Sequence, residues 1–418
     1  MNGQSSLGRA AALARLAWQY LWARPLTAVL NWLMLSLGLA AVTLVLLVST
    51  QLDRAFERDL QGIDLVVGAK GSPLQLILSG VFHIDVPTGN IPLREVEALA
   101  QHPMVAQVIP LSLGDSYQGF RIVGTTPDYL ALYGAQFAQG QSWQQPLQAV
   151  LGAAAARGLQ RPDLPAGTSL VGATFIGTHG LGGGGHAHGD HPYTVTGVLA
   201  PCGCALDRLI LTSTESVWAV HETHMATDAE DLALLRAERE VTVALVRYRT
   251  PMAAVSLPRQ INSQTEMQAA APALEVTRLL RLLGVGADVL RAFGVVLLAV
   301  AALSVFIALW NAVRERRADL ALLRMLGAPP TRIAGLLLAE ALWLAVLSSG
   351  FGLLLGHALT EVLGQVLAAQ GLLTVTGWAW VPEQAAVPLM ATGVAVVAAL
   401  LPALQAYRTD VGDLLGAP

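Results

Sequence analysis

Four long apolar segments constrain this chain more than any other feature of its sequence. The segments 26–50 and 292–313 contain no charged residue, and a third is interrupted only by the ionisable Glu340 and His357. A helix needs about 17–25 mostly apolar residues to cross a bilayer, so each segment is long enough to span a membrane. We predict transmembrane helices over residues 26–50, 286–313, 333–360 and 385–407.

The overall composition agrees with a membrane protein. Of the 418 residues, 54% are hydrophobic and 13% are charged, whereas charged residues make up about 25% of a typical soluble domain. The net charge of −4 provides no basic surface of the kind that nucleic acids need, which argues against a nucleic-acid partner.

The distribution of arginine predicts how the chain crosses the membrane, because short cytoplasmic segments are enriched in Lys and Arg. Residues 1–25 and 314–332 are rich in arginine, while 361–384 contain neither Arg nor Lys. We therefore expect both termini, including a tail over 408–418, and the 314–332 segment on the cytoplasmic side of the membrane. The short 361–384 loop and the large 51–285 segment should then lie on the opposite side.

The first 25 residues have the pattern of an amphipathic helix, with Trp18 and Trp22 beside arginines. Such a helix suits the headgroup region of a membrane. The alternative is a cleavable signal peptide, whose apolar core is about 7–15 residues long. The apolar run here is longer and starts only at Leu26, which favours a retained anchor.

Residues 51–285 read as an extracytoplasmic α+β domain inserted between the first and second transmembrane helices. Short β-branched runs at 105–114, 118–126, 193–200, 208–213 and 241–249 predict strands. The segments 92–102 and 228–240 predict helices, and 260–291 predicts a helical stalk that leads into the second span.

The connection between the second and third spans has an unusual concentration of charge. We expect a short helix with one apolar face, made by Leu320, Leu322, Leu323 and Leu326, and a polar face made by Arg316, Arg317 and Arg324. Gly327 suits the position after a helix C-terminus, and the Pro329–Pro330 pair prevents the helix from continuing.

Two stretches resemble the permease domain of the FtsX/MacB/lipoprotein-release group of ABC transporters. They are "RERRADLALLRMLGAPPTRIAGLLLAEALWLA" at 314–345 and "LPALQAYRTDVGDLL" at 401–415. The resemblance implies a permease subunit that couples ATP hydrolysis by a separate cytoplasmic ATPase to movement of its periplasmic domain, which is called mechanotransmission. The implied ATPase-coupling residues are Arg316, Arg317, Leu320, Leu323, Arg324, Leu326 and Gly327.

The chain lacks the phosphate-binding loop of an ATPase. That loop needs Gly-X4-Gly-Lys-Ser/Thr, and the single lysine, Lys70, follows Ala69 in the external domain. We therefore expect no enzyme activity from this chain, and ATP and Mg²⁺ on the partner subunit. A homodimer is the expected assembly, with a heterodimer of two permeases as the alternative. The sequence does not identify the cargo, and it leaves open whether a periplasmic or outer-membrane partner exists.

Glu340 lies about ten residues into the third span, and a carboxylate facing lipid at the bilayer centre costs about 2.5–3.5 kcal/mol. We expect it near the cytoplasmic side, paired with Arg324 or Arg332. The alternative is a carboxylate that simply reaches interfacial water.

Histidine and cysteine residues cluster in the external domain. Six of the nine histidines fall within 46 residues, and imidazole and thiolate are preferred ligands of zinc and copper. The candidate ligands for Zn or Cu are His179, His186, His188, His191, Cys202, Cys204, His221 and His224. Their spacing matches no fixed zinc motif, so a solvated His-rich loop is the competing interpretation.

A second hypothesis for the whole chain is a membrane-anchored periplasmic protein that binds or senses metal through this cluster. A secondary transporter is disfavoured, because only four spans are predicted and such transporters usually show duplicated halves.

Overall fold

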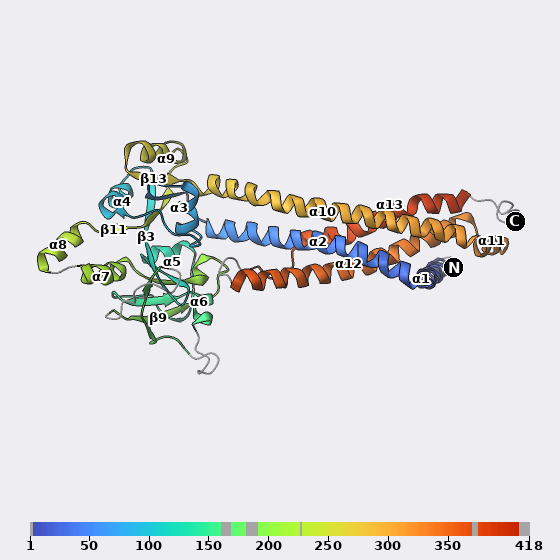
Figure 1. The fold of residues 1–418 in the computed structure, drawn as a ribbon, viewed down its shortest axis with the longest axis horizontal. Helices are drawn as coiled ribbons and strands as arrows, with labels where there is room; N and C mark the ends of the chain where they lie inside the picture. The colour runs from blue at the N-terminus through green and yellow to red at the C-terminus, as the bar shows by residue number, and fades with distance from the viewer. Residues whose placement is uncertain (1–2, 160–168, 181–190, 226–227, 370–374, 409–418) are drawn as a thin grey trace. The chain divides into compact units, whose positions relative to one another are not determined.

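The computed structural model describes residues 3–159, 169–180, 191–225, 228–369 and 375–408 (Figure 1). His186, His188 and most of the predicted C-terminal tail lie outside these residues. The chain divides into two units, a helical unit made of residues 1–52 and 283–418 and an α/β unit made of residues 53–282. Each unit is described by itself.

The helical unit contains the four long apolar helices that the sequence predicts. α1 and α11 lie at the same end of this unit (Figure 1). The elements are α1 (Gly3–Trp22), α2 (Pro25–Asp59), α10 (Pro272–Glu315), α11 (Arg317–Met325), α12 (Pro330–Ala369), the 3₁₀ turn η2 (Pro382–Ala385) and α13 (Ala386–Arg408).

Small residues allow these helices to approach closely. Gly352 and Gly356 of α12 lie one turn apart, and an added Cβ would lie 2.7 Å from the Cβ of Leu39 and 2.5 Å from that of Thr43, both on α2. This is the small-xxx-small arrangement that lets membrane helices pack backbone against backbone. On α13 a stripe of buried alanines has the same role, formed by Ala391, Ala395, Ala398, Ala399, Ala403 and Ala406.

The third apolar helix is longer than the predicted span. α12 continues to Ala369, nine residues beyond the expected boundary at Thr360. Glu361 then accepts hydrogen bonds from the Gly377 amide at 2.9 Å and the Thr376 hydroxyl at 3.0 Å. The side chain of Gln51 on α2 also donates to the Thr376 carbonyl at 2.9 Å. These contacts fasten the α12–α13 connection to α2.

The α/β unit is built on an 11-stranded sheet in the order β13-β1-β12-β3-β4-β10-β6-β9-β5, with β7 beside β9 and β8 beside β3. Most neighbours are antiparallel, but β10 with β4 and β6 with β9 are parallel. The strands are β1 (Leu65–Ala69), β2 (Ile91–Pro92), β3 (Val105–Tyr117), β4 (Phe120–Thr125), β5 (Phe137–Gly140), β6 (Gln148–Leu151), β7 (Thr174–Phe175), β8 (Thr178–His179), β9 (Tyr193–Leu199), β10 (Leu209–Ser213), β11 (Glu240–Val241), β12 (Val243–Tyr248) and β13 (Met267–Ala270).

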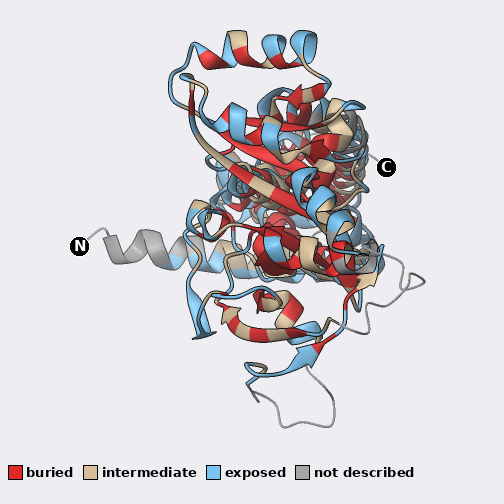
Figure 2. Ribbon diagram, turned by 90° about the vertical axis from the view of Figure 1, so that its left-hand side faces the viewer, coloured by how far each residue is buried: buried red, intermediate tan, exposed pale blue. Residues whose placement is uncertain are grey.

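Short helices pack around this sheet. They are α3 (Pro73–Gly80), α4 (Leu93–Ala100), α5 (Pro127–Leu132), α6 (Ala153–Gly158), the 3₁₀ turn η1 (Ala205–Arg208), α7 (Thr214–Met225), α8 (Ala229–Ala237) and α9 (Ala253–Gln264). The strands hold most of the buried residues (Figure 2).

Among the described residues, the α/β unit has two apolar cores, and the long strand β3 reaches both. Val105, at the start of β3, belongs to one core, and Tyr117, at its end, packs against the other. Between them the register of β3 against β4 shifts between Leu113 and Asp115. Such a bulge bends a strand and re-aims the side chains that follow it.

The five predicted strands and two predicted helices of this unit are confirmed, as β3, β4, β9, β10, β12, α4 and α8. The predicted stalk over 260–291 is wrong in its first part. α9 ends at Gln264, Met267 begins strand β13 at the edge of the sheet, and the long helix α10 starts only at Pro272. The apolar residues that suggested one helix belong first to a strand and then to a separate helix.

Candidate functional site

The turn between α11 and α12 has the geometry that its Gly-Ala-Pro-Pro sequence predicts. Gly327 adopts a left-handed φ of +89°. Its amide donates to the carbonyl of Arg324 at 3.0 Å, and the Ala328 amide donates to the carbonyl of Leu323 at 3.0 Å. These are the two hydrogen bonds of a Schellman motif. The backbone therefore fixes where α11 ends and where α12, from Pro330, begins.

The apolar side chains of α11 divide between two faces. Leu320 is buried in the helical core and Leu323 is half-buried. In contrast, Leu322, Met325 and Leu326 are 53%, 57% and 77% exposed. The prediction of a single apolar face is wrong: Leu320 and Leu323 are three residues apart and share one face, whereas Leu322, Met325 and Leu326 share the opposite face. The outer face of α11 is therefore itself apolar, and we call Leu322, Met325 and Leu326 the outer patch.

Arg316, just before α11, points into the helical unit. Its guanidinium donates to Glu340 at 2.8 Å and to the carbonyl of Tyr20 at 2.8 Å, and it lies 4.5 Å from the centre of the Tyr20 ring. Arg324 and Arg332 were the predicted partners of Glu340, and this prediction is wrong. The arginine just before α11, Arg316, forms the ion pair with Glu340 on α12 instead. Arg316 therefore joins α1, α11 and α12 and is not part of a polar outer face.

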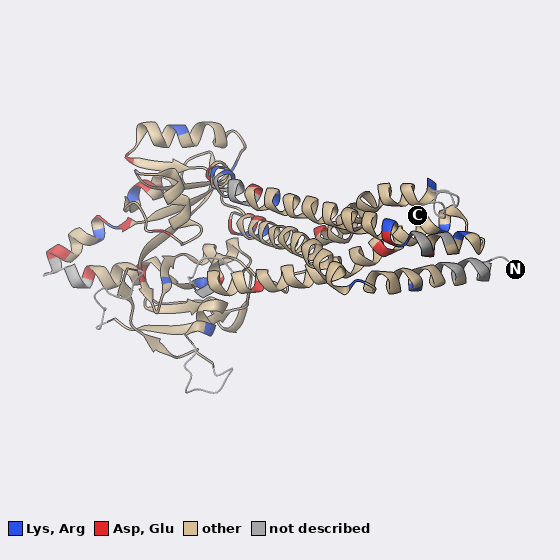
Figure 3. Cartoon of the chain, turned by 45° about the vertical axis from the view of Figure 1, so that its right-hand side comes forward, with Lys and Arg blue, Asp and Glu red and all other residues tan. Residues whose placement is uncertain are grey.

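The other predicted coupling arginines are less informative. The side chain of Arg317 lies outside the described part of the chain, and Arg324 is half-buried. A further ion pair links Arg24, in the turn before α2, to Glu315 at the end of α10. Figure 3 shows basic residues near both chain termini, at the end of the helical unit that holds α11.

The predicted amphipathic helix α1 packs along α12. The indole of Trp343 donates to the carbonyl of Ala14 at 3.0 Å, and its ring lies 5.0 Å from that of Trp18. Beside this contact, an apolar groove of about 640 Å³ runs between α1, α11 and α12. Leu323 faces this groove together with Leu13 and Leu336.

Two of the predicted metal ligands of the α/β unit come together with a residue that the sequence did not single out. His179 Nδ1 lies 3.0 Å from one carboxylate oxygen of Asp115, and His221 Nε2 lies 3.6 Å from the other. The two imidazole rings are 5.0 Å apart. One ligand atom from each residue falls within 4.8 Å of the others.

The fold explains this convergence. Asp115 and His179 stand directly opposite each other in the antiparallel pair of β3 and β8, so their side chains point to the same face. His221 comes from α7, which packs against β3. Sixty-four residues separate Asp115 from His179, and the bulge in β3 precedes Asp115 directly. Local sequence patterns give no signal for such a pairing.

The remaining predicted ligands are not part of this group. Among the described residues, His191 is half-buried and is not in the group, and the side chain of His224 lies outside what the structure describes. Cys202 and Cys204 form a disulfide with a Cα–Cα separation of 5.2 Å, within the usual range. The prediction that they bind metal is wrong for this state, because thiolate is the form that binds metals.

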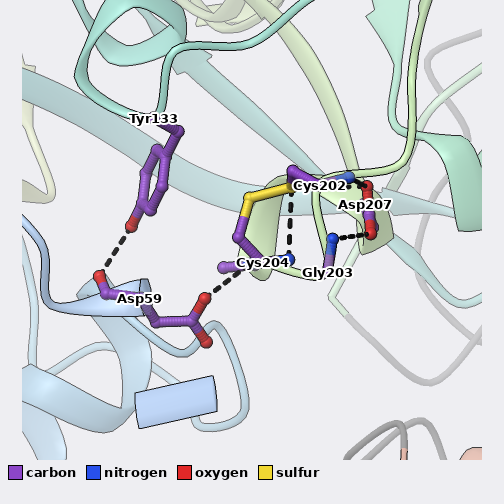
Figure 4. The surroundings of a disulfide bond; sticks show 7 residues. Asp59, Tyr133, Cys202, Gly203, Cys204 and Asp207 are labelled. Carbon is purple, nitrogen blue, oxygen red and sulfur yellow. Dashed lines mark hydrogen bonds between the residues drawn. A yellow bond between two sulfur atoms is a disulfide. The ribbon is translucent and has the colours of Figure 1, made fainter. Parts of the chain in front are cut away.

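Figure 4 shows how the disulfide loop is held. The carboxylate of Asp207 accepts hydrogen bonds from the amides of Cys202 at 3.0 Å and Gly203 at 2.8 Å. The buried carboxylate of Asp59, the last residue of α2, accepts from the amide of Ala205 at 2.7 Å. Asp59 therefore ties the end of α2 to the start of η1, and Asp207 of η1 holds the adjacent disulfide loop.

Comparison with known families gives two matches that together cover nearly the whole chain. The model of the MacB-like periplasmic core domain matches residues 28–277, and the model of the FtsX-like permease C-terminal region matches residues 291–411. The chain belongs to the FtsX/MacB-like permeases. It is thus a permease subunit of the ABC-transporter type, whose usual partner is a cytoplasmic ABC ATPase, and the family is not one of enzymes.

Solved structures similar to this FtsX/MacB-like permease share little sequence with it. The periplasmic region of MacB from Actinobacillus actinomycetemcomitans is 12% identical, with 53% of this chain and 95% of that chain covered and a TM-score of 0.34. The extracellular domain of the noncanonic ABC-type transporter YknZ from Gram-positive bacteria is 12% identical, with 50% and 98% covered and a TM-score of 0.29. No curated protein matches the chain.

The family also locates the permease. Four apolar helices and a MacB-like periplasmic core domain indicate an inner-membrane protein whose α/β unit is periplasmic. This assignment favours the permease over the alternative of an anchored metal sensor.

Proposed function

We propose that this permease works by mechanotransmission. A separate cytoplasmic ATPase binds and hydrolyses ATP, its movement displaces α11, and the displacement reaches the periplasmic α/β unit, which exports or extracts a substrate. The single observation that carries the proposal is the construction of α11. It is anchored on its inner side, stopped by a fixed turn and apolar on its outer side.

The anchoring supports force transmission. Leu320 lies in the core that α2, α10, α12 and α13 share, and Arg316 binds Glu340 of α12 and the Tyr20 carbonyl of α1. A helix held in this way moves together with the spans instead of turning on its own. Since the Schellman turn also fixes the start of α12, a push on α11 is delivered to α10 and α12.

The outer patch supports docking. Three large apolar side chains, Leu322, Met325 and Leu326, are more than half exposed beside arginine-rich segments. An apolar centre with a charged rim is the usual make-up of a protein interface. We propose that the ATPase subunit covers this patch. Leu323, which faces the groove beside α1, then has a packing role and not a docking role.

Two continuous helices provide the path out of the helical unit. α2 and α10 each pass without a break through the boundary between the two units, at residues 52–53 and 282–283. α10 contains 44 residues, which corresponds to about 66 Å at 1.5 Å per residue. We propose that these helices act as levers.

We also propose that two copies form the transporter. The described apolar part of α10 is the least buried of the four candidate spans, at 28%. Its exposed side chains include a stripe with alternating spacings of three and four residues, the spacing of a coiled-coil seam. The stripe consists of Val289, Phe293, Val296, Val300, Leu303 and Ile307. A second copy of α10 fits this seam, and a related permease is the alternative partner.

The test replaces one residue of the outer patch in the full chain and measures how much ATPase co-purifies with the permease. Leu326→Asp should lower the amount of ATPase that co-purifies with the permease by more than about tenfold, because a buried, unpaired carboxylate at an interface costs several kcal/mol. Any ATPase that remains bound should show no response to the permease. Thermal unfolding of the isolated permease should stay unchanged.

Leu274→Asp is the matched control. Leu274 is 66% exposed at the start of α10, in the α/β unit, and its replacement should leave ATPase binding intact. Equal co-purification of the ATPase with wild-type and Leu326→Asp permease would contradict the proposed docking surface.

A further inference from the structure

We propose that Asp115, His179 and His221 form a binding site for a divalent cation of the Zn²⁺ class in the α/β unit. The proposal concerns the periplasmic domain alone and does not depend on how the permease is driven. It replaces the broad His/Cys cluster of the sequence with three residues from β3, β8 and α7.

The distances between the ligand atoms fit a metal site. Two ligands that each lie about 2.0–2.1 Å from a tetrahedral Zn²⁺ are about 3.3 Å apart. The two His–Asp distances, 3.0 and 3.6 Å, lie on either side of this value, and each ends at a different oxygen of the Asp115 carboxylate. One ligand atom from each of the three residues lies within 4.8 Å of the others. A shift of the imidazoles, whose side chains are 46% and 35% exposed, would bring all three ligands around one ion.

The donor set selects the metal. The three residues offer two imidazole nitrogens and one carboxylate oxygen, a set that suits Zn²⁺. Cu⁺ prefers thiolate and thioether ligands, and both cysteines are in the disulfide with each other. Three protein ligands also leave a fourth tetrahedral position for water or another group.

The surroundings of Asp115 favour a bound cation. The Asp115 side chain is 2% exposed, and a carboxylate removed from water needs compensating positive charge. The two histidines, or a cation that they share with Asp115, would supply positive charge beside this carboxylate.

A bound ion would join three elements of the domain. β8 is the last described segment before the His-rich stretch 181–190, and α7 follows β10 much later in the chain. Through Asp115 the ion would fasten both elements to the central strand β3. Zn²⁺ binding should therefore stabilise the α/β unit by mass action, because the unfolded chain lacks the assembled site.

The test uses the full chain, purified in detergent without a polyhistidine tag and treated with a chelator. Titration calorimetry with ZnCl₂ should show one saturable site. His179→Ala, His221→Ala and Asp115→Asn should each weaken Zn²⁺ binding by more than about tenfold. His179 is nearly half exposed, so its replacement tests the site without disturbing the core.

The Co²⁺-loaded protein supplies a second measurement. Its absorption spectrum should show ligand-field bands without a sulfur-to-cobalt charge-transfer band, and Cys202→Ser/Cys204→Ser should leave the spectrum unchanged. The proposal is overturned if the wild-type chain shows no saturable site, if the three variants bind Zn²⁺ as the wild type does, or if the Co²⁺ spectrum shows thiolate ligation.

Discussion

At the scale of single residues, Arg316 is the most informative side chain of the helical unit. Its side chain is 15% exposed and that of its partner Glu340 is 4% exposed. Such a pair contributes little net stability compared with apolar residues of the same size, but loss of one partner leaves a charge buried without compensation. The pair therefore acts mainly to specify where the start of α11 must lie.

We predict that Glu340→Gln destabilises the permease, by about 3–5 kcal/mol if Arg316 keeps its buried position. The double variant Arg316→Met/Glu340→Leu, which removes both charges, should be more stable than Glu340→Gln. The measurement is thermal unfolding of the detergent-solubilised chain. A double variant that is no more stable than Glu340→Gln would contradict the prediction.

Sequence reasoning identified both residues but not their pairing. Glu340 stands out as an acid within an apolar run, and Arg316 as one of several arginines. Several arginines lie close to Glu340 in the predicted topology, so the sequence does not show which one pairs with it. The pairing follows from the turn after α10, which directs Arg316 inward. Asp115 is the harder case, because a single acid in a strand has no distinguishing pattern until β8 lies beside β3.

At the scale of elements, the contact between α2 and α12 depends on glycine. Gly352 and Gly356 remove the side chains that would hold the two backbones apart. In a bilayer, burying apolar surface gives little advantage over lipid, so close packing of this kind is a main source of helix association. Force transmission from α11 requires α2 and α12 to move together, and this close contact couples the two helices.

We predict that Gly356→Leu separates the two helices and costs about 1–3 kcal/mol through overpacking. Gly350→Leu is the matched control on the same helix, because an added Cβ there has no atom within 4 Å. The unfolding temperature should fall for the first variant and stay close to the wild-type value for the second. Equal effects of the two substitutions would show that α2 does not pack on this face.

Periodicity and end signals predicted the long apolar helices, five of the strands and the helices α4 and α8, and Gly327 marked the turn that follows α11. The stalk prediction failed for a physical reason. The apolar residues between 260 and 291 fit a helical period, yet Met267 pairs with Ala69 of β1 at the edge of the sheet. Tertiary pairing overrode the local pattern there.

At the scale of the whole molecule, the central expectation is that α11 and the α/β unit lie on opposite sides of the membrane. The distribution of arginine predicts it, and the family places the α/β unit in the periplasm. Trp378 and Trp380 in the α12–α13 connection are 88% and 71% exposed, as expected for aromatic residues at a membrane interface.

We predict that single cysteines report this arrangement in a Cys202→Ser/Cys204→Ser background. A membrane-impermeant maleimide, applied to cells with a permeabilised outer membrane, should label Val255→Cys and Trp378→Cys, at positions that are 76% and 88% exposed. Met325→Cys should react only after lysis. Labelling of Met325→Cys and Val255→Cys under the same conditions would refute the orientation and the force path built on it.

The pairing of β8 with β3 has a consequence for how the periplasmic domain can vary. Side chains alternate along a strand, so a shift of one residue turns every side chain of β8 to the opposite face. Insertions after Gly180 should be tolerated, because they lengthen a connection without moving β8. A single deletion just before Thr178 would turn the His179 imidazole away from Asp115. Homologues that keep both residues should therefore conserve the chain length immediately before β8, while the length of the glycine-rich stretch after it should vary.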